Sequence, residues 1–337
     1  MVAPDRSRLL KRLCLAVLLV ILLAACAPVK PPAAAPEATA KIKVGVQPFI
    51  GYAPFFIAQD AGYFARHGIE AELIESKSSD EIVTQLMQGD LDMANFAITP
   101  GFFNGVAKGG TAKAVLGGSR WDPNQCAPSG LVALPQQAAQ LKDPANWKGI
   151  KIGTDPVGLQ SMYGLFVAGV LKQQGLTLAD IETVRLPPAA TIDALESGAI
   201  NVAQVNEPWL TRVKDKTGAI LVVGTPEIAP NGQLTMIGFS PRLLQDSELG
   251  KRAAAAFLEA VKQYGEGSAN AQNVEIFAKY TKLEPALVKQ ICWPAMPLDG
   301  IANLDSVAAF QAWAVAQGLQ DRVLEQSEYW DGRFVGE

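Results

Sequence analysis

The chain has 337 residues, of which 49% are hydrophobic and 18% charged, and its formal net charge is −4 at pH 7. This length and composition can supply the core of one large or two ordinary domains, which excludes a mini-protein and wholesale disorder. Because the net charge is negative, no nucleic-acid partner is expected.

The amino-terminal segment has the pattern of an export signal. Four basic side chains within residues 6–12 precede an apolar run over residues 13–25. A spanning helix needs about 20 apolar residues, so this run is too short to cross a membrane. Residues 1–25 are therefore interpreted as a cleavable signal peptide, with an uncleaved membrane anchor as the alternative.

The apolar run ends in Leu-Ala-Ala-Cys at residues 23–26, which resembles a bacterial lipobox. In lipoproteins with this pattern, the cysteine becomes the first residue after cleavage and its thiol carries diacylglycerol. The resemblance implies that Cys26 is lipidated and that acyl chains hold the protein on the extracytoplasmic face of the cell membrane. Residues 26–40 are rich in Pro and Ala, which predicts an extended tether.

Four cysteines occur in the chain. Cys14 leaves with the signal and Cys26 carries the lipid, so Cys126 and Cys292 remain. Outside the cytoplasm such a pair favours a disulfide. Two separate buried thiols stay an alternative, because the sequence does not give the distance between them. The Cys and His residues lack the spacing of a zinc site, so neither a metal nor a cofactor is expected.

The body of the chain contains a repeated pattern. Residues 42–48 match residues 150–156, and residues 86–95 match residues 195–204, with offsets of 108 and 109 residues. Each copy reads as strand, helix, strand, helix, strand. Such alternation forms a mainly parallel sheet flanked by helices, so two copies predict two α/β lobes.

Local signals support the first copy. Pro54 is predicted to open its first helix, because proline fits the first turn. Ser78 and Glu81 have the spacing of a capping box before the second helix, and Gly89 is predicted to end that helix.

Ligands of such sheets collect outside the carboxyl ends of the strands, so two facing lobes predict a shared cleft. Five loops are its candidate walls: residues 47–52, 95–99, 117–121, 154–163 and 206–209. Aromatic residues in these loops have packing beneath the loop as an alternative role. The candidate ligand-binding residues are Gln47, Phe49, Tyr52, Asn95, Phe96, Thr99, Trp121, Asp155, Gln160, Ser161, Tyr163, Asn206, Glu207 and Trp209.

Several segments in order resemble the nitrate, sulfonate, taurine and thiamine-pyrimidine branch of the ABC-transporter substrate-binding proteins. The likeness runs over about residues 41–265 and is carried by Gly51–Ala58, Gly62–Phe64, Leu86–Ala94, Asn95–Pro100 and Val205–Trp209. No single segment is decisive, but their order is hard to obtain otherwise.

The resemblance implies a two-lobed type II periplasmic-binding-protein fold with two crossing hinge strands. Lobe 1 is expected over residues 41–132 and 236–337, and lobe 2 over residues 133–235, with crossings near residues 131–134 and 234–239. It also implies a monomeric receptor that closes on a small molecule and delivers it to an ABC permease and its ATPase.

An enzyme is the strongest rival, because pyrimidine synthases of thiamine biosynthesis share this fold and consume an active-site histidine. The only histidine here is His67, in a helix-end turn far in sequence from every candidate loop. No enzymatic activity is therefore expected. A receptor that signals rather than feeding a transporter is a second alternative.

The ligand is expected to be a neutral or weakly cationic aromatic heterocycle, such as a thiamine-type pyrimidine or riboflavin. Arg120 is the only basic residue in the five loops, whereas Asp155 and Glu207 would repel an anion. Helix amino termini can hold an anion through backbone N–H groups, so a sulfonate, taurine or nitrate receptor remains the alternative.

The lipobox interpretation predicts that Cys26→Ser abolishes metabolic labelling with palmitate, because the acceptor thiol is lost. Labelling of the two proteins expressed in the same host, followed by immunoprecipitation, measures the effect. Full labelling of the variant would show that the chain is not a lipoprotein of this type.

Overall fold

A computed structural model of the chain describes residues 39–155, 157–224, 229 and 231–335. The expected signal peptide, Cys26 and nearly all of the expected tether lie outside these ranges. Within them, no helix has the length and apolar character that crossing a membrane requires. Thr39 and the residues that follow it belong to one compact unit.

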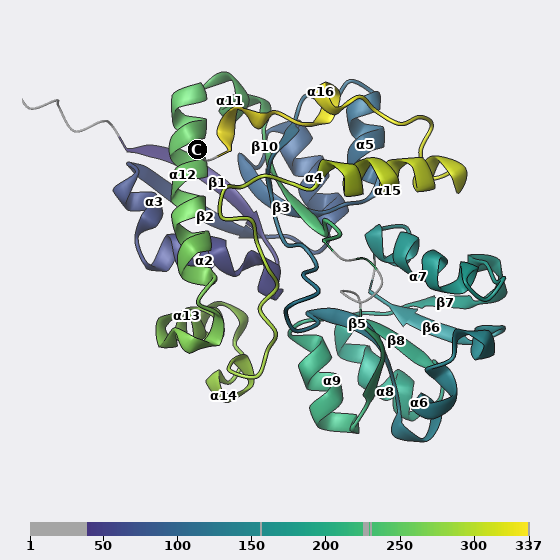
Figure 1. The fold of residues 1–337 in the computed structure, drawn as a ribbon. Helices are drawn as coiled ribbons and strands as arrows, with labels where there is room; N and C mark the ends of the chain where they lie inside the picture. Colours follow the sequence, from purple (N-terminus) through teal and green to yellow (C-terminus); the bar gives the residue numbers. More distant parts are fainter. Residues whose placement is uncertain (1–38, 156, 225–228, 230, 336–337) are drawn as a thin grey trace, which may run out of the picture. The chain divides into compact units, whose positions relative to one another are not determined.

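The first sheet has five strands in the order β2-β1-β3-β10-β4 (Figure 1). β1 pairs in parallel with β2 and β3, whereas β10 is antiparallel to both β3 and β4. The strands are β1 (Ala40–Val46), β2 (Ile69–Glu75), β3 (Met93–Ala97), β4 (Lys113–Gly117) and β10 (Thr235–Phe239).

The second sheet repeats this arrangement in the order β7-β6-β8-β5-β9. Here β5 is the strand that runs antiparallel to its neighbours β8 and β9. The strands are β5 (Ser129–Ala133), β6 (Lys151–Thr154), β7 (Glu182–Arg185), β8 (Val202–Asn206) and β9 (Ile220–Gly224). The expected architecture of two α/β lobes, each built on a mainly parallel sheet, is confirmed.

The chain passes from the first sheet to the second between β4 and β5, and returns between β9 and β10. Each sheet therefore receives its antiparallel strand from the chain just after a crossing. The boundary expected after residue 132 falls inside β5, which pairs entirely within the second sheet. An apolar run such as residues 131–134 shows that a strand forms, but its partner strands are set by tertiary pairing.

Helices of lobe 1 cover both faces of its sheet. α12 packs against α2 and α3 (Figure 1), with the Phe55 and Phe257 rings 4.8 Å apart between centroids. The helices are α2 (Ala53–Asp60), α3 (Tyr63–Arg66), α4 (Ser79–Gln88), α5 (Pro100–Ala107), α11 (Pro241–Gln245), α12 (Ser247–Tyr264), α13 (Ala271–Thr281), α14 (Pro285–Val288), α15 (Leu304–Ala316) and α16 (Gln326–Tyr329), with 3-10 turns η1 (Ile50–Tyr52), η5 (Gly267–Ala269) and η6 (Gly332–Phe334).

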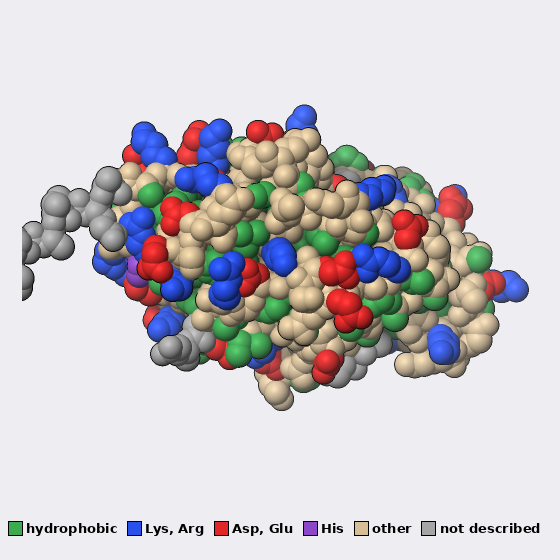
Figure 2. Space-filling view, turned by 90° about the horizontal axis from the view of Figure 1, so that it is seen from above, with side chains coloured by type: hydrophobic (Ala, Val, Ile, Leu, Met, Phe, Trp, Pro, Cys, Tyr) green, Lys and Arg blue, Asp and Glu red, His purple; other side chains and the backbone are tan. Residues whose placement is uncertain are grey.

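Lobe 2 has fewer helices. They are α6 (Pro135–Leu141), α7 (Met162–Lys172), α8 (Thr191–Glu196) and α9 (Trp209–Thr217), with 3-10 turns η2 (Pro144–Trp147), η3 (Leu178–Asp180) and η4 (Pro188–Ala190). On the face of the molecule seen in Figure 2, acidic and basic side chains are interspersed, so this face does not present a field of one sign.

The helix signals predicted at Pro54 and Gly89 are confirmed, whereas the capping box forms only in part. The Glu81 carboxylate accepts from the N–H of Lys77 at 2.7 Å and not from that of Ser78. Pro54 lies in the first turn of α2. The Ser78 hydroxyl accepts a hydrogen bond from the backbone N–H of Glu81 at 3.2 Å, which caps α4. Gly89 ends α4 with φ of 80°, a left-handed conformation that glycine adopts without steric cost.

A disulfide joins Cys126 to Cys292, whose Cα atoms are 5.8 Å apart. Of the two states that the sequence left open for this pair, the structure has the bonded one. Cys126 lies in the segment between β4 and β5, and Cys292 lies between α14 and α15. The bond therefore fastens the first crossing segment to the carboxyl-terminal part of lobe 1.

Removing this disulfide is expected to lower the free energy of unfolding by about 2–4 kcal/mol, because the bond closes a chain separation of 166 residues in the unfolded state. Denaturant unfolding of the Cys126→Ser, Cys292→Ser double variant measures the loss. Dithiothreitol should destabilise the wild type and leave the double variant unchanged. Thiol alkylation of either residue in denatured, unreduced protein would contradict the bond.

Candidate functional site

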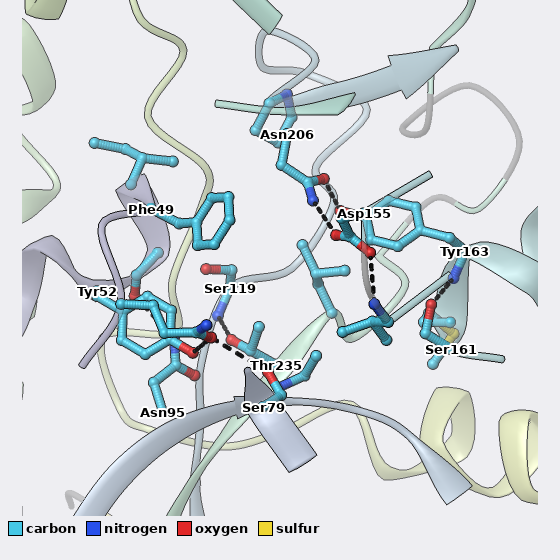
Figure 3. Close-up of a pocket in the computed structure, with 18 of the residues that line it drawn as sticks. Phe49, Tyr52, Ser79, Asn95, Ser119, Asp155, Ser161, Tyr163, Asn206 and Thr235 are labelled. Atoms are coloured by element: carbon cyan, nitrogen blue, oxygen red, sulfur yellow. Dashed lines mark hydrogen bonds between the residues drawn. The ribbon is translucent and has the colours of Figure 1, made fainter. Parts of the chain in front are cut away.

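A pocket with a volume of about 160 Å³ opens between the two lobes, where the carboxyl ends of β1 and β3 face those of β6 and β8 (Figure 3). A cavity of about this size admits one benzene-sized molecule, so the pocket suits a small ligand. Of the candidate residues, those that line it are Gln47, Phe49, Tyr52, Asn95, Asp155, Ser161, Tyr163, Asn206 and Glu207.

The two lobes touch across this pocket. The backbone N–H of Ile50 donates to the carbonyl of Glu207 at 3.4 Å, and the N–H of Met162 donates to the carbonyl of Ile98 at 3.3 Å. Gly164 of α7 also lies beside α15, since an added Cβ would come within 2.7 Å of the Trp313 ring, although the Leu159 carbonyl of lobe 2, closer still to that position, requires glycine there by itself. The structure is therefore in a closed conformation.

Lobe 1 contributes a hydrogen-bonded aromatic wall. The Tyr52 hydroxyl donates to Gln47 Oε1 at 2.7 Å, and the Ser79 hydroxyl accepts from the N–H of Ala97 at 3.2 Å. Burial raises the pKa of Tyr52, so its phenol is a neutral group. Phe49 is partly buried and lines the pocket (Figure 3).

Behind this wall, two buried oxygens lack a protein partner. The Asn95 amide donates to the carbonyl of Gly51 at 3.0 Å, which leaves its Oδ1 unpaired. The Ser119 N–H donates to the Thr235 hydroxyl oxygen at 2.9 Å, but the Ser119 hydroxyl itself is unpaired. The Asn95 Oδ1 accepts only and so disfavours an anion at this side of the pocket, whereas the Ser119 hydroxyl can donate as well as accept.

Lobe 2 contributes the Asp155 carboxylate, which forms no ion pair among the described residues, although the nearby Arg185 guanidinium acts to lower its pKa. Asp155 Oδ1 accepts from the N–H groups of Val157 and Gly158, each at 3.1 Å, while Oδ2 has a long 3.4 Å contact from the Asn206 amide. Asn206 is held in turn by the Tyr163 hydroxyl, which donates to its Oδ1. Burial raises the pKa of Asp155, against the lowering effect of the two N–H groups.

Glu207 also lines the pocket, but protein donors occupy both of its carboxylate oxygens. Oε2 accepts from the Thr211 N–H at 3.0 Å. Oε1 accepts from the Thr211 hydroxyl at 2.8 Å and from the N–H of Cys292 at 3.3 Å. Burial raises the pKa of Glu207, partly offset by these donors.

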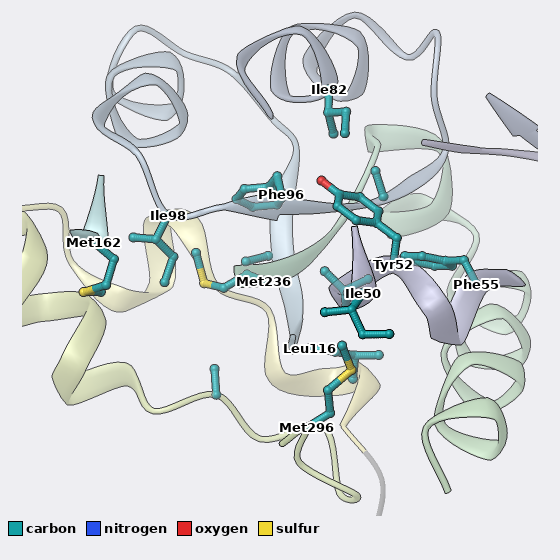
Figure 4. Close-up of a cluster of buried hydrophobic side chains, with 14 of the residues drawn as sticks. Ile50, Tyr52, Phe55, Ile82, Phe96, Ile98, Leu116, Met162, Met236 and Met296 are labelled. Carbon is teal, nitrogen blue, oxygen red and sulfur yellow. The ribbon is translucent and has the colours of Figure 1, made fainter. Parts of the chain in front are cut away.

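Phe96 and Thr99 do not line the pocket. Successive residues of a strand face opposite sides, so Phe96 turns away when Asn95 faces the pocket. Its ring lies 4.6 Å from that of Phe102, within the apolar cluster of Figure 4. The Thr99 hydroxyl donates to Asp80 Oδ1 at 3.3 Å.

The other three candidates also lie outside the pocket lining. Trp121 is fully buried and supports Tyr163 from behind, with ring centroids 5.6 Å apart, so it fills the packing role that the sequence left open. Gln160 is exposed to solvent. The Trp209 ring lies under the Arg212 guanidinium at 4.5 Å, which places it on the surface of α9.

Several lining residues were missed from the sequence. Lys77, Ser78 and Ser79 lie where β2 gives way to α4, which is the position that the Ser78 capping signal marked. The loop containing Ser119 was a candidate wall, although Ser119 was not itself selected. Thr235 enters from β10, whose pairing the sequence did not reveal.

The basic residue found at the pocket is not the one that the sequence offered. Arg120, the cation that the loops offered, is not among the lining residues. Lys77 is among them, but its side chain is exposed at the rim. The ionisable groups inside the lining are thus the half-buried Asp155 carboxylate, the buried Glu207 carboxylate, and the neutral phenols of Tyr52 and Tyr163.

His67 lies away from the pocket and contacts Glu259 of α12 through its Nε2, at 2.8 Å. Among the described residues that line the pocket there is neither a histidine nor a cysteine. The described part of the chain contains no cluster of three or more His, Cys, Asp or Glu side chains suited to a metal.

Residues 35–280 match the model of the NMT1-like family. No protein of curated function matches the sequence. Solved structures share the fold at low identity. The alkanesulfonate-binding protein SsuA of Xanthomonas axonopodis pv. citri, bound to MOPS, has a TM-score of 0.70 and 18% identity, covering 87% of this chain and 99% of that one.

Two further structures show the range of the fold. The periplasmic aliphatic sulphonate binding protein SsuA of Escherichia coli has a TM-score of 0.70 and 16% identity, covering 87% of this chain and 92% of its own. The desulfurization enzyme DSZB has a TM-score of 0.63 and 15% identity, covering 88% and 97%. The same two-lobed fold therefore carries both binding proteins and an enzyme.

Asp155→Asn is expected to raise the free energy of unfolding at pH 7 by roughly 1 kcal/mol, because it removes a desolvated carboxylate while its Oδ1 still accepts from the loop. A raised folded-state pKa means that the stability contributed by the protonated group is complete below the unfolded value of 3.8 and is lost as pH rises through the folded value. The gain should therefore be small at pH 4 and grow toward pH 7 in denaturant unfolding.

The exposed Asp180 provides the matched control. Hydrogen bonds from Thr177 lower the pKa of Asp180, so Asp180→Asn should destabilise the protein at pH 7. Destabilisation of the same sign by Asp155→Asn would show that the Asp155 carboxylate is compensated within the protein.

Proposed function

The chain belongs to the NMT1-like family, and on that premise we propose that it is a receptor which binds a small solute between its lobes and delivers it to the permease of an ABC importer. The observation that carries this proposal is the closed pocket, whose wall takes side chains from the strand ends of both lobes. The two SsuA neighbours, described as sulfonate-binding proteins, support this role.

A receptor of this kind needs contacts that exist only when the lobes are closed. A ligand that touches both walls stabilises the closed form by its differential contacts and so shifts the open–closed equilibrium. The Ile50–Glu207 and Met162–Ile98 hydrogen bonds are present only when the lobes meet. The permease and its ATPase are then the partners that act on the closed, loaded monomer.

The export and anchoring of the chain are part of the proposal. The lipobox-like residues 23–26 would attach a diacylglycerol to Cys26 and hold the folded lobes at the extracytoplasmic face of the cell membrane. The Cys126–Cys292 disulfide supports this location, because such bonds persist in oxidising compartments.

The charges of the pocket favour a neutral or weakly cationic ligand. Asp155 presents an oxygen with only one long contact, and Arg185 offsets its charge from a distance without forming an ion pair among the described residues. An N–H group of the ligand would complete its coordination. Phe49 and Tyr52 offer aromatic faces, so an aromatic heterocycle fits, and the pocket volume favours a thiamine-type pyrimidine over the larger riboflavin.

A sulfonate is the second candidate. The first turn of α4 lines the pocket with Ser78 and Ser79, and Lys77 stands at its rim. Helix amino termini and a lysine together can bind an oxyanion. Catalysis is less favoured than binding, because the lining residues offer neither a cysteine nor a histidine as a nucleophile or base.

Mass spectrometry of small molecules that copurify with the protein, followed by calorimetric titration, tests the proposal. A 4-aminopyrimidine of the thiamine type should bind more tightly than riboflavin, taurine or nitrate, and it should raise the melting temperature with occupancy. Tight binding of taurine with no response to heterocycles would contradict the proposed ligand class and leave the proposed receptor role intact. Turnover of a bound compound would contradict the receptor role.

A further inference from the structure

Glu207 occupies a junction of three parts of the molecule. Its N–H donates to the carbonyl of Pro128, at the end of the first crossing segment, at 2.9 Å. Its carbonyl accepts from Ile50 of lobe 1. Its carboxylate holds Thr211 at the start of α9 in lobe 2 and, with the same Oε1, the N–H of Cys292 in lobe 1.

The Cys292 end of this contact is fixed to lobe 1. The next residues are anchored there, because the Tyr264 hydroxyl of α12 donates to the carbonyl of Pro294 at 2.9 Å. The Trp293 ring packs 5.2 Å from that of Tyr264. The backbone N–H that Glu207 reaches therefore moves with lobe 1.

The disulfide lies at the same point. It ties Cys292 to Cys126 in the first crossing segment, and a second bond between the two segments runs from the N–H of Arg120 to the carbonyl of Ala295 at 2.9 Å. The crossing segment and residues 292–295 are thus fastened together on the lobe 1 side. The disulfide sets where the Cys292 N–H stands relative to the crossing.

We propose that Glu207 is a positioning residue which couples closure to ligand binding: its carboxylate joins α9 of lobe 2 to the Cys292 N–H of lobe 1, at a place fixed by the Cys126–Cys292 disulfide. In an open form the N–H and the carboxylate separate, and the Cys292 N–H loses its acceptor. The contact therefore adds to the closed form alone, which raises the affinity of whatever ligand closes the lobes.

The chemistry of the side chain suits this role. Oε2 accepts from the Thr211 N–H at the amino terminus of α9, while Oε1 accepts both from the Thr211 hydroxyl and, across the lobes, from the Cys292 N–H. Glutamine keeps one acceptor oxygen and turns its NH2 group toward either the Thr211 N–H or the Cys292 N–H, so one of these two contacts is lost. Glu207→Gln should therefore weaken closure while preserving the size of the side chain.

Small-angle X-ray scattering of the dialysed protein, without added small molecules, tests closure directly. Glu207→Ala and Glu207→Gln should both increase the radius of gyration, and so should the Cys126→Ser, Cys292→Ser variant. Thr211→Val is the matched control, because it removes the Thr211 hydroxyl bond within lobe 2 and leaves the contact to Cys292. An unchanged radius of gyration in both Glu207 variants would overturn the proposal.

The effect on affinity, which rests on the proposed function, is measured with a thiamine-type 4-aminopyrimidine and with taurine. For the probe that binds the wild type, Glu207→Gln should weaken binding about tenfold and Thr211→Val less than twofold. Adding Cys126→Ser and Cys292→Ser to Glu207→Gln should weaken binding only slightly further, because the disulfide and Glu207 act through the same contact. Full additivity would instead mark Glu207 as a direct ligand contact.

The scattering and affinity measurements distinguish failure of the proposed function from failure of the Glu207 proposal. If neither probe nor any copurifying small molecule binds the wild type, the proposed function fails, while the scattering comparison still decides whether Glu207 holds the lobes together. If a probe binds and both Glu207 variants bind it as tightly as the wild type, the coupling is wrong and the receptor stands.

Discussion

The carboxyl ends of two parallel sheets meet in this protein, and every polar group that ends there must be satisfied by its own lobe, by the other lobe or by a ligand. Parallel strands end at one edge of their sheet, so the loops after β1, β3, β6 and β8 are brought together when the lobes close. A buried group that stays unsatisfied there costs free energy. The pairing of these groups therefore decides what the pocket can hold.

The polar groups at the pocket are hydrogen-bonded to different extents in the two lobes. Gln47, Tyr52 and Ser79 form a hydrogen-bonded set in lobe 1, but Asn95 and Ser119 behind them keep unpaired oxygens. In lobe 2, Asp155 has an oxygen that only a distant amide approaches. Asn95 Oδ1 and the Asp155 oxygen are acceptors, so N–H donors of a ligand satisfy them and an anion does not, whereas the Ser119 hydroxyl can donate as well as accept. The aromatic side chains contribute area without changing this balance.

Closure uses another set of contacts, placed at the edge of the pocket. The Glu207 carboxylate accepts hydrogen bonds from Thr211 of α9 and from Cys292. The disulfide links Cys292 to Cys126 in the first crossing segment. The residues that shape the pocket and those that hold it shut thus meet at one side chain. Such an arrangement lets the hinge, rather than the pocket wall, set how strongly a ligand is held.

The sequence by itself determined the two-lobed α/β fold, because strand and helix periodicities repeat and are local properties of the chain. It also located most of the pocket, since loops that follow parallel strands converge for reasons of topology. Which face a side chain takes was decided by register, so Phe96 went to the core while Asn95 faced the pocket. Tertiary structure alone placed β5 in the second sheet, joined Cys126 to Cys292, brought Lys77 to the rim and placed the Cys292 N–H against Glu207 Oε1. Each of these depends on a distance between residues far apart in the chain, and a sequence pattern carries no such distance.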